Sequence, residues 1–508
     1  MNVKEYLKEN ILYLDGGMGT LLQAHGLSAG ELPERWNITQ PENIIGIHRD
    51  YFDAGSNVVN ANTFGANILK FSPCELEDII GAAIKNARYA AEQSAGVQPK
   101  WVALDIGPTG KLLKPYGDLD FEDAVAAFAE TVKLGVKYGA DLIFIETMSD
   151  SYETKAALLA AKENSDLPVF VSNAYGANGK LMTGADPAAM VAMLEGMGAD
   201  AIGVNCSLGP KALFAMVEEY LKYASVPVIL KPNAGLPQIV DGKSVYNVLP
   251  DEFANEASEL VRRGVRLVGG CCGTTPEYIL ATVKATEDIS PVDIEPKSFT
   301  CASSRTHAVI FGDAPVQIGE RIDPNHLADE IADEDIDSII DEAMEQEEDG
   351  ADVLGVSVGG SVNDEARLLT DVIGEIQMMI DLPLQISTSD PAALESALRR
   401  YNGKAMIKCV NPESEYMDAV FALVKKYGGS VVVPTLDEGE DPTDAEGKLA
   451  IAERILAKAQ KHGVDRKNII FDPVVSSADT DAEIVRAAEL IKSSLGCHTS
   501  IGTYKILL

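Results

Sequence analysis

Three cysteines stand where the chain could bring thiolates together around a metal ion. Cys206 ends an apolar run at residues 200–206, and Cys271 and Cys272 end another at residues 265–272. Three thiolates at strand ends would bind Zn²⁺ and leave its fourth position free, as in catalytic zinc sites. The gap between Cys206 and Cys271 is far longer than in zinc ribbons, so the spacing alone leaves two alternatives open: buried inert thiols and redox chemistry.

A second candidate site follows the first apolar run of the chain. Asp15, Gly16 and Gly17 form a predicted turn whose backbone N–H groups could bind a carboxylate. The alternative is an ordinary tight turn in which Asp15 caps the following helix. Both interpretations place these residues in a turn at the end of the first strand. They differ in whether the turn binds a carboxylate or only begins the following helix.

Eight predicted strands in the first 290 residues would position these groups. Amphipathic segments such as residues 122–138 and 187–198 separate the strands and are long enough to cross between parallel strands. This alternation predicts a (β/α)₈ barrel, whose active site lies at the C-terminal ends of its strands. An open doubly wound sheet is the alternative, although no G-x-G-x-x-G motif follows the first strand. The predicted strands are residues 11–17, 57–63, 101–107, 141–147, 168–174, 200–206, 227–235 and 265–272.

The strand pattern resumes after a polar, proline-containing linker. We predict domains at residues 1–290 and 308–508, with the linker at residues 291–307. The fold class is therefore α/β with two tandem TIM-type barrels, of which the second is truncated and has about seven strands. The strands of this half are predicted at residues 316–321, 352–358, 383–389, 405–410, 429–436, 469–475 and 497–504.

Composition excludes several classes of partner. The chain has 42 basic and 78 acidic residues and a formal net charge of −36, which argues against nucleic acid or an anionic membrane as the main partner. Charged residues precede the first apolar run, unlike in a signal peptide, and no run of about 18 apolar residues could span a membrane. Seven cysteines do not form a disulfide framework, so we expect a cytoplasmic protein.

Several motifs occur together in the first half and in a fixed order. They are Asp15–Thr20, Glu34–Asn37, Asn62–Asn67, Glu146–Thr147, Asn205–Cys206, Pro232–Pro237 and Gly269–Gly273. With these motifs the chain resembles the homocysteine S-methyltransferase family over residues 1 to about 290. The order of the two barrels further resembles the N-terminal half of the cobalamin-dependent methionine synthases.

The resemblance implies roles for the candidate residues. Cys206, Cys271 and Cys272 would hold a catalytic Zn²⁺, whose fourth position takes the homocysteine thiolate. Glu146 would pair with the substrate ammonium, although a solvated rim carboxylate is the alternative. Asn233 would order the loop beside the zinc. Asn62 and Thr63 are expected behind the residues that touch substrate.

The second half matches a pterin-binding barrel only in part. Glu320 matches the opening motif, and Asp472 matches a late-strand motif that would read donors on the pterin ring. Carboxylates and amides expected elsewhere are replaced by side chains that cannot make the same hydrogen bonds. The use of methyltetrahydrofolate is therefore open, and Asp390 is a possible substitute for one lost carboxylate. The replaced positions carry Asp323, Gly355, Ser357, Ser387, Lys408 and Tyr504–Lys505.

The resulting hypothesis is a zinc-dependent homocysteine S-methyltransferase that forms methionine with a methylated corrinoid as donor. No D-x-H-x-x-G motif is present, so the corrinoid (cobalamin) is expected on a separate partner protein. Two alternatives remain: the same acceptor with a small donor such as S-methylmethionine, and a non-catalytic module that docks a corrinoid protein. Three cysteines at strand ends favour an enzyme over a docking module.

Overall fold

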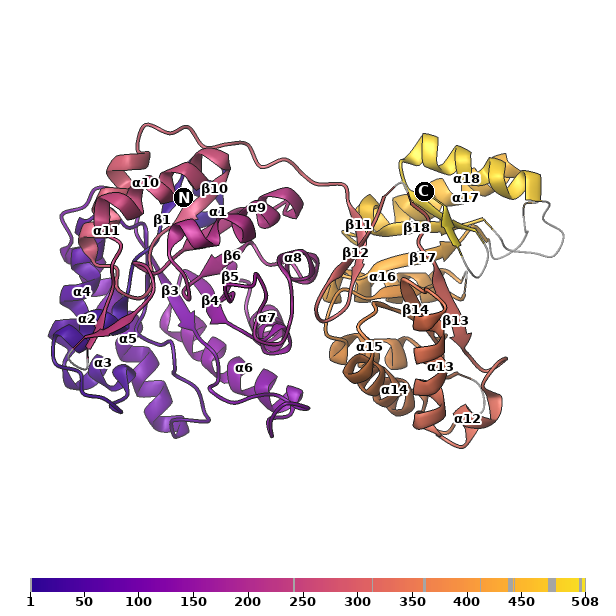
Figure 1. Ribbon diagram of the computed structural model, residues 1–508, viewed down its shortest axis with the longest axis horizontal. Coiled ribbons are helices and arrows are strands. Elements are labelled where there is room, and N and C mark those ends of the chain that lie inside the picture. Colours follow the sequence, from indigo (N-terminus) through magenta and orange to yellow (C-terminus); the bar gives the residue numbers. More distant parts are fainter. Residues whose placement is uncertain are drawn as a thin grey trace. The chain divides into compact units, whose positions relative to one another are not determined.

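The computed structural model describes residues 2–240, 243–312, 314–359, 362–411, 413–436, 442, 444–473, 481–501 and 505–507. Its internal contacts divide the chain into two units, each built on one sheet of mainly parallel strands (Figure 1). The first unit contains Met1–Pro187 and Ala199–Lys297, and the second contains Ala188–Gly198 and Ser298–Leu508. No described helix is long and apolar enough to cross a membrane.

The first unit is a closed barrel of eight parallel strands. The sheet runs in the order β1-β10-β7-β6-β5-β4-β3-β2, and a parallel bridge between Leu14 and Val58 joins its two ends. The predicted (β/α)₈ fold of this half is confirmed. Its strands are β1 (Leu12–Tyr13), β2 (Val58–Asn60), β3 (Trp101–Ile106), β4 (Leu142–Met148), β5 (Val169–Asn173), β6 (Ala201–Asn205), β7 (Val228–Lys231) and β10 (Val265–Val268).

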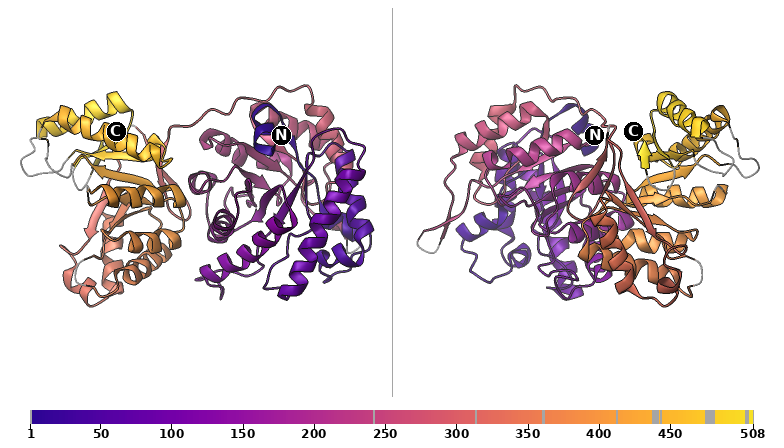
Figure 2. Two further views of the ribbon diagram at one scale, coloured as in Figure 1. Left: turned by 180° about the vertical axis from the view of Figure 1, so that it is seen from behind. Right: turned by 45° about the vertical axis from the view of Figure 1, so that its right-hand side comes forward.

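Helices follow the strands and surround the barrel (Figures 1 and 2). Local signals fix their ends: in α6, for example, the Asp120 side chain accepts from the Glu122 N–H, and Gly139 ends the helix at φ 84°. The principal helices are α2 (Met18–Ala24), α4 (Pro41–Asp53), α5 (Pro73–Gln93), α6 (Phe121–Tyr138), α7 (Ser151–Asn164), α8 (Pro187–Gly196), α9 (Phe214–Tyr223), α10 (Pro250–Arg263) and α11 (Pro276–Thr286). A hairpin of β8 (Gln238–Val240) and β9 (Lys243–Val245) follows β7.

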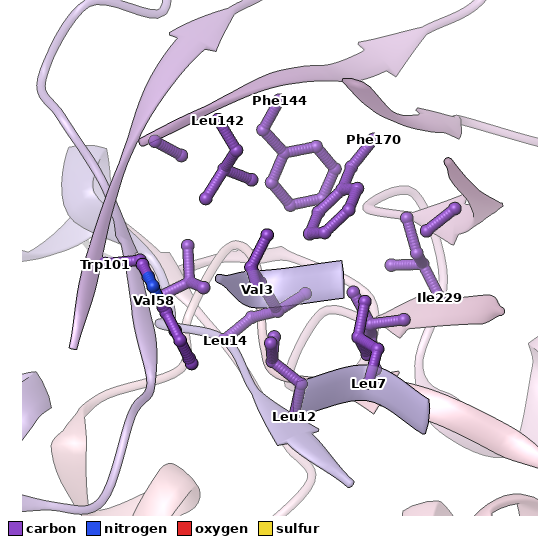
Figure 3. Close-up of a cluster of buried hydrophobic side chains, with 13 residues drawn as sticks. Val3, Leu7, Leu12, Leu14, Val58, Trp101, Leu142, Phe144, Phe170 and Ile229 are labelled. Atoms are coloured by element: carbon purple, nitrogen blue, oxygen red, sulfur yellow. The ribbon is translucent and has the colours of Figure 1, made fainter. Parts of the chain in front are cut away.

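An N-terminal helix closes the bottom of this barrel. Helix α1 (Val3–Glu9) places Val3 and Leu7 against apolar side chains that fill the barrel near the strand starts (Figure 3). Arg266 of β10, which is 2% exposed, donates to the carbonyls of Leu7 and Lys8 and to that of Val292 beyond the barrel. Because the bottom is filled, a ligand enters from the C-terminal ends of the strands.

One buried histidine gives the fold a predicted acid sensitivity. His48 of α4 is fully buried, and within the described residues neither ring nitrogen has a hydrogen-bond partner. Burial lowers the pKa of His48 to about 3. Below about pH 6.5 the unfolded chain therefore binds a proton at this histidine that the folded chain does not bind. The free energy of unfolding falls with the pH, by about 2 kcal/mol at pH 5. Urea unfolding of metal-free protein at pH 7.5 and pH 5 measures this loss, and His48→Leu should remove it. An equal loss in that variant would contradict the prediction.

In the described residues of the second unit, seven parallel strands form an open sheet. The strands lie in sequence order, as predicted for an incomplete barrel, and they are β13 (Ile318–Ile322), β14 (Val353–Val356), β15 (Leu384–Ser387), β16 (Met406–Lys408), β17 (Ser430–Pro434), β18 (Ile469–Asp472) and β19 (His498–Ile501). A short strand that the pattern does not predict, β20 (Lys505–Leu507), pairs antiparallel with β19. The helices are α12 (Ala328–Ala332), α13 (Ile336–Glu348), α14 (Glu365–Met379), α15 (Pro391–Arg400), α16 (Ser414–Tyr427), α17 (Ala445–Lys461) and α18 (Asp481–Leu495).

A β-hairpin packs against the start of this second sheet. Strand β11 (Thr300–Ser303), which lies inside the predicted linker, pairs antiparallel with β12 (Ala308–Phe311). Ala302 and Phe311 of the hairpin share an apolar cluster with residues at or near the starts of the strands. The hairpin therefore fills the bottom of the second sheet, as α1 does in the first barrel.

Candidate functional site

The three predicted cysteines meet at the C-terminal end of the first barrel. Cys206 follows β6, and Cys271 and Cys272 follow β10. Their Sγ atoms all lie within 4.8 Å of one another, with 3.9 Å between those of Cys206 and Cys272. Four ligands at a Zn–S distance of about 2.3 Å in a tetrahedron are about 3.8 Å apart. The sulfur positions therefore fit a Zn²⁺ ion with one further ligand.

The three thiols of the cluster differ in pKa. Hydrogen bonds from Cys271 and Cys272 lower the pKa of Cys206 to about 3. The hydrogen bond to Cys206 raises the pKa of Cys272 to about 11, and hydrogen bonds within the trio raise the pKa of Cys271 well above its usual value. Near neutral pH the three sulfurs therefore share one negative charge. A metal ion that binds all three would displace two protons, so metal affinity at this site rises with pH.

An asparagine joins the cysteines to the end of β4. Asn205 is fully buried, and its Nδ2 donates to Thr147 Oγ1 at 2.7 Å and to Cys271 Sγ at 3.9 Å. Its Oδ1 accepts from the Thr147 N–H and from Ser172 Oγ, both at 2.8 Å. Thr147 and Cys206 have left-handed backbones at φ 62° and 59°. Because such conformations cost about 1–3 kcal/mol each, the surrounding hydrogen bonds must hold them.

A cavity of about 210 Å³ opens beside the cysteines. Asp15, Gly16, Gly17 and Glu146 line it, as does Asn62. The remaining lining residues are Met18, Gly19, Thr20, Pro33, Glu34, Asn60, Phe64, Asp105, Thr147, Lys231 and the three cysteines. One cavity is therefore lined both by residues predicted to bind the ammonium and carboxylate groups of the substrate and by the cysteines predicted to bind a metal.

Two further predicted residues lie behind this lining. Asn233 does not line the cavity, but its Oδ1 accepts from the Cys272 N–H at 3.0 Å and so fixes the cysteine loop. Thr63 is buried, and its Oγ1 donates to the Asp105 carbonyl at 2.8 Å. Both side chains hold backbone groups of their neighbours. Asn62, which the sequence analysis places beside Thr63 behind the lining, itself lines the cavity.

Gly17 has a packing role. Its N–H donates to Thr274, so we do not propose this group as a carboxylate ligand. A Cβ at Gly17 would lie 2.7 Å from the Cys271 carbonyl oxygen and 2.6 Å from Thr20 Oγ1. The glycine therefore lets the first turn approach the cysteine loop closely.

Lys231 is a site residue that the sequence reasoning missed. Its side chain is 2% exposed, and its Nζ lies 2.8 Å from Glu146 Oε2 and 3.1 Å from Asp15 Oδ1. Burial opposes the charge of Lys231, yet the carboxylates of Glu146 and Asp15 raise its pKa well above the usual value. Burial raises the pKa of Asp15 to about 6 although Lys231 acts against it. The Glu146 carboxylate, which is predicted to bind the substrate ammonium, and the Asp15 carboxylate of the predicted turn are thus already paired with a lysine.

Asp105, Glu34 and Asn60 also line the cavity, and no role was predicted for them. The sequence does contain a signal for two of the missed residues. Asp105 and Lys231 are charged residues at the C-terminal ends of the otherwise apolar strands β3 and β7. Such a residue is costly to bury, so its presence at this end of a barrel strand indicates a site.

The second unit places its two predicted pterin residues on separate strands. Glu320 lies on β13, where its Oε1 accepts from Lys408 Nζ at 2.8 Å and from Gln385 Nε2 at 2.9 Å. Asp472 ends β18. Asp390 caps α15 by accepting from the Ala392 N–H, which gives it a structural role in the helix. Tyr504, which also departs from the pterin pattern, lies outside the described residues.

Comparison with known proteins assigns the first barrel. Residues 12–286, more than half of the chain, match the family model described as homocysteine S-methyltransferase. The chain belongs to the homocysteine S-methyltransferase family. Residues 322–506 match the model described as pterin binding enzyme. The predicted resemblance to this enzyme family, with a pterin-binding type of second domain, is confirmed.

Relatives of this family member include much longer proteins. It is 30% identical over 509 residues to the methionine synthase of Mycobacterium tuberculosis (strain ATCC 25618 / H37Rv) and 29% identical over 518 residues to that of Mycobacterium leprae (strain TN). Each match covers 94% of this chain and 42% of the relative. Among solved structures, the oxidized homocysteine methyltransferase MmuM from Escherichia coli is 25% identical, with a TM-score of 0.47, over 54% of this chain and 95% of that one.

Proposed function

We propose that the first barrel transfers a methyl group to the thiolate of homocysteine in a zinc-dependent reaction that forms methionine. The observation that carries this proposal is the cluster of three sulfurs at the edge of a cavity lined by carboxylates. Membership in the homocysteine S-methyltransferase family supports the choice of acceptor. A free thiol with a pKa near 8.5 is mostly protonated at neutral pH, so the acceptor has to be activated.

The residues around the cysteine cluster have different roles in this proposed reaction. Cys206, Cys271 and Cys272 would hold Zn²⁺, which when bound lowers the pKa of a thiol at its free position. Asn205 fixes Cys271 through its Nδ2, and Asn233 fixes the backbone of Cys272. The cavity beside the cysteines holds the rest of the substrate, so that the acceptor sulfur stays at the open end of the barrel, where a methyl donor can reach it.

We propose a methylated corrinoid on a separate protein or module as the donor. The loops that follow β2, β3, β5, β7 and β9 carry exposed apolar side chains, which a macromolecule can bury. These side chains are Phe64, Leu112, Tyr116, Met182, Leu236 and Leu249. The longer relatives are named methionine synthases, which supports methionine as the product.

The test measures bound zinc and methionine formation in the same preparation. With homocysteine as acceptor, methylcobalamin should yield methionine in the zinc-loaded protein. Chelation should stop the reaction, and added zinc should restore it. Activity with S-methylmethionine but not with methylcobalamin would replace the proposed donor by a small one. Absence of zinc together with absence of methyl transfer from either donor would refute the proposal.

Methyltetrahydrofolate is expected to bind the second unit only weakly. The Glu320 carboxylate already forms an ion pair with Lys408 and accepts a hydrogen bond from Gln385. A pterin would have to break these contacts before it could bind the carboxylate. We expect a Kd above about 0.1 mM by calorimetry, compared with micromolar values for specific ligands. Saturable micromolar binding that Asp472→Ala abolishes would contradict this prediction and would identify a working pterin site.

A further inference from the structure

A tyrosine on the loop after β9 contacts the cysteine cluster from outside the cavity. Tyr246 is partly buried, and it is not among the residues that line the cavity. Its side chain forms a hydrogen bond with that of Cys272. Because Tyr246 contacts a sulfur but not the cavity, it can influence the metal site without touching the substrate.

The ring of Tyr246 rests on the glycine that follows the two adjacent cysteines. A Cβ on Gly273 would lie 2.3 Å from Tyr246 Cγ and 2.4 Å from its Cδ2, so only a glycine fits beneath the ring. Gly273 also has a left-handed backbone at φ 81°, a conformation that favours glycine. The ring therefore covers the backbone directly after Cys272.

The loop that carries Tyr246 is joined to the same cysteine through the backbone. The Val248 N–H donates to the Ala234 carbonyl at 3.0 Å, and the Ala234 N–H donates to the Cys272 carbonyl, also at 3.0 Å. Tyr246 and Val248 pack against an apolar cluster that includes Phe253. Backbone hydrogen bonds and apolar packing thus fix the loop, so the Tyr246 hydroxyl has a defined position relative to Cys272.

The hydroxyl is the donor in this contact. Burial raises the pKa of Tyr246 to about 12, and the negative charges of Cys272 and Cys206 act in the same direction. The hydroxyl therefore keeps its proton near neutral pH, whereas a thiolate sulfur can only accept a hydrogen bond. A donor to a metal-bound thiolate holds the ligand in place and withdraws charge from its sulfur, which leaves the metal more positive.

We infer that Tyr246 is a positioning residue of the proposed metal site and donates a hydrogen bond to the Cys272 sulfur. The inference rests on the proposed function, because it assumes that the three cysteines bind Zn²⁺. The bond reduces the electron donation of one sulfur to the metal, so a thiol at the free position loses its proton more readily. Tyr246 thus acts on the acceptor thiol only through Cys272 and the metal.

Tyr246→Phe tests the inference, because it removes the hydroxyl and keeps the ring on Gly273. Zinc affinity is measured by competition with a chromophoric chelator, and we expect the variant to bind Zn²⁺ about 10-fold more weakly than the parent, as is typical when a partner of a metal ligand is lost. In Co²⁺-loaded protein, the sulfur-to-cobalt charge-transfer absorption should move to longer wavelength. A sulfur that has lost its hydrogen-bond donor gives up an electron more easily.

Tyr278→Phe is the matched control. The Tyr278 hydroxyl donates to the Val248 carbonyl at 2.7 Å, so the control loosens the same loop but leaves the donor to Cys272 in place. It should keep the parental charge-transfer absorption and a zinc affinity close to that of the parent. An unshifted absorption in Tyr246→Phe overturns the inference, whatever its zinc affinity, and so does an equal shift in Tyr278→Phe. If the parent binds neither metal ion, the proposed function fails, and the inference fails with it.

Discussion

Cys272→Ala is expected to abolish methyl transfer. The variant keeps only Cys206 and Cys271 of the three ligands of the proposed Zn²⁺ site, so we expect the metal, and with it the activation of the acceptor thiol, to be lost. Metal coordination contributes several kcal/mol to such a step, so we expect a fall in kcat/KM of at least about a thousandfold. Methionine formation from homocysteine and methylcobalamin, together with zinc content after dialysis, measures both losses.

Cys74→Ala is the matched control for this prediction. Cys74 is an exposed free cysteine on α5 and lies outside the cavity lining. The control variant should retain parental zinc content and activity, which separates the loss of a ligand from the loss of any thiol. Parental activity in Cys272→Ala would rule out zinc activation by the three cysteines.

Lys231→Met is expected to destabilise the first barrel strongly. The substitution leaves the carboxylates of Asp15 and Glu146 buried together without their shared cation. Breaking a buried ion pair by removal of one partner costs about 3–5 kcal/mol. For a unit of this size we expect the melting temperature to fall by roughly 6–10 °C, measured by calorimetry on metal-free protein.

Two variants test the cause of that loss. Lys231→Met combined with Glu146→Gln removes one buried negative charge and should recover part of the stability. Lys137→Met removes a lysine whose ion pair with Glu77 is exposed, and it should leave the melting temperature close to that of the parent. A Lys231→Met protein as stable as the parent would show that the buried carboxyl groups are neutral when the lysine is absent.

Sequence reasoning predicted the strands and the cysteine cluster for the same physical reason. Parallel strands of a barrel are buried on both faces, so they stand out as apolar runs, and their C-terminal ends must lie together. Cys206 and Cys271 could therefore be placed side by side although they are far apart in the sequence. The confirmed order of seven parallel strands in the second unit follows from the same pattern.

Pairings within the site could not be predicted in this way. Lys231 joins Asp15 and Glu146 from strands that are not neighbours in the sheet, and which side chains face the barrel interior depends on register. Strand β11 was missed because a short polar run resembles a linker when its hairpin partner is not known. Asp105 interrupts an apolar strand. Within the part of the chain that the structure describes, its Oδ1 has no hydrogen-bond partner, which becomes evident only when all neighbouring donors are in place.

Arg266 joins the two ends of the first barrel. One guanidinium group holds the carbonyl of Leu7, where the chain enters the barrel, and that of Val292, where the chain leaves it. A unit whose ends are fastened to the same strand can be attached to other sequences without a change in its interior. The two ends of the barrel are therefore held near one another, an arrangement that favours its use as one domain of a multidomain protein.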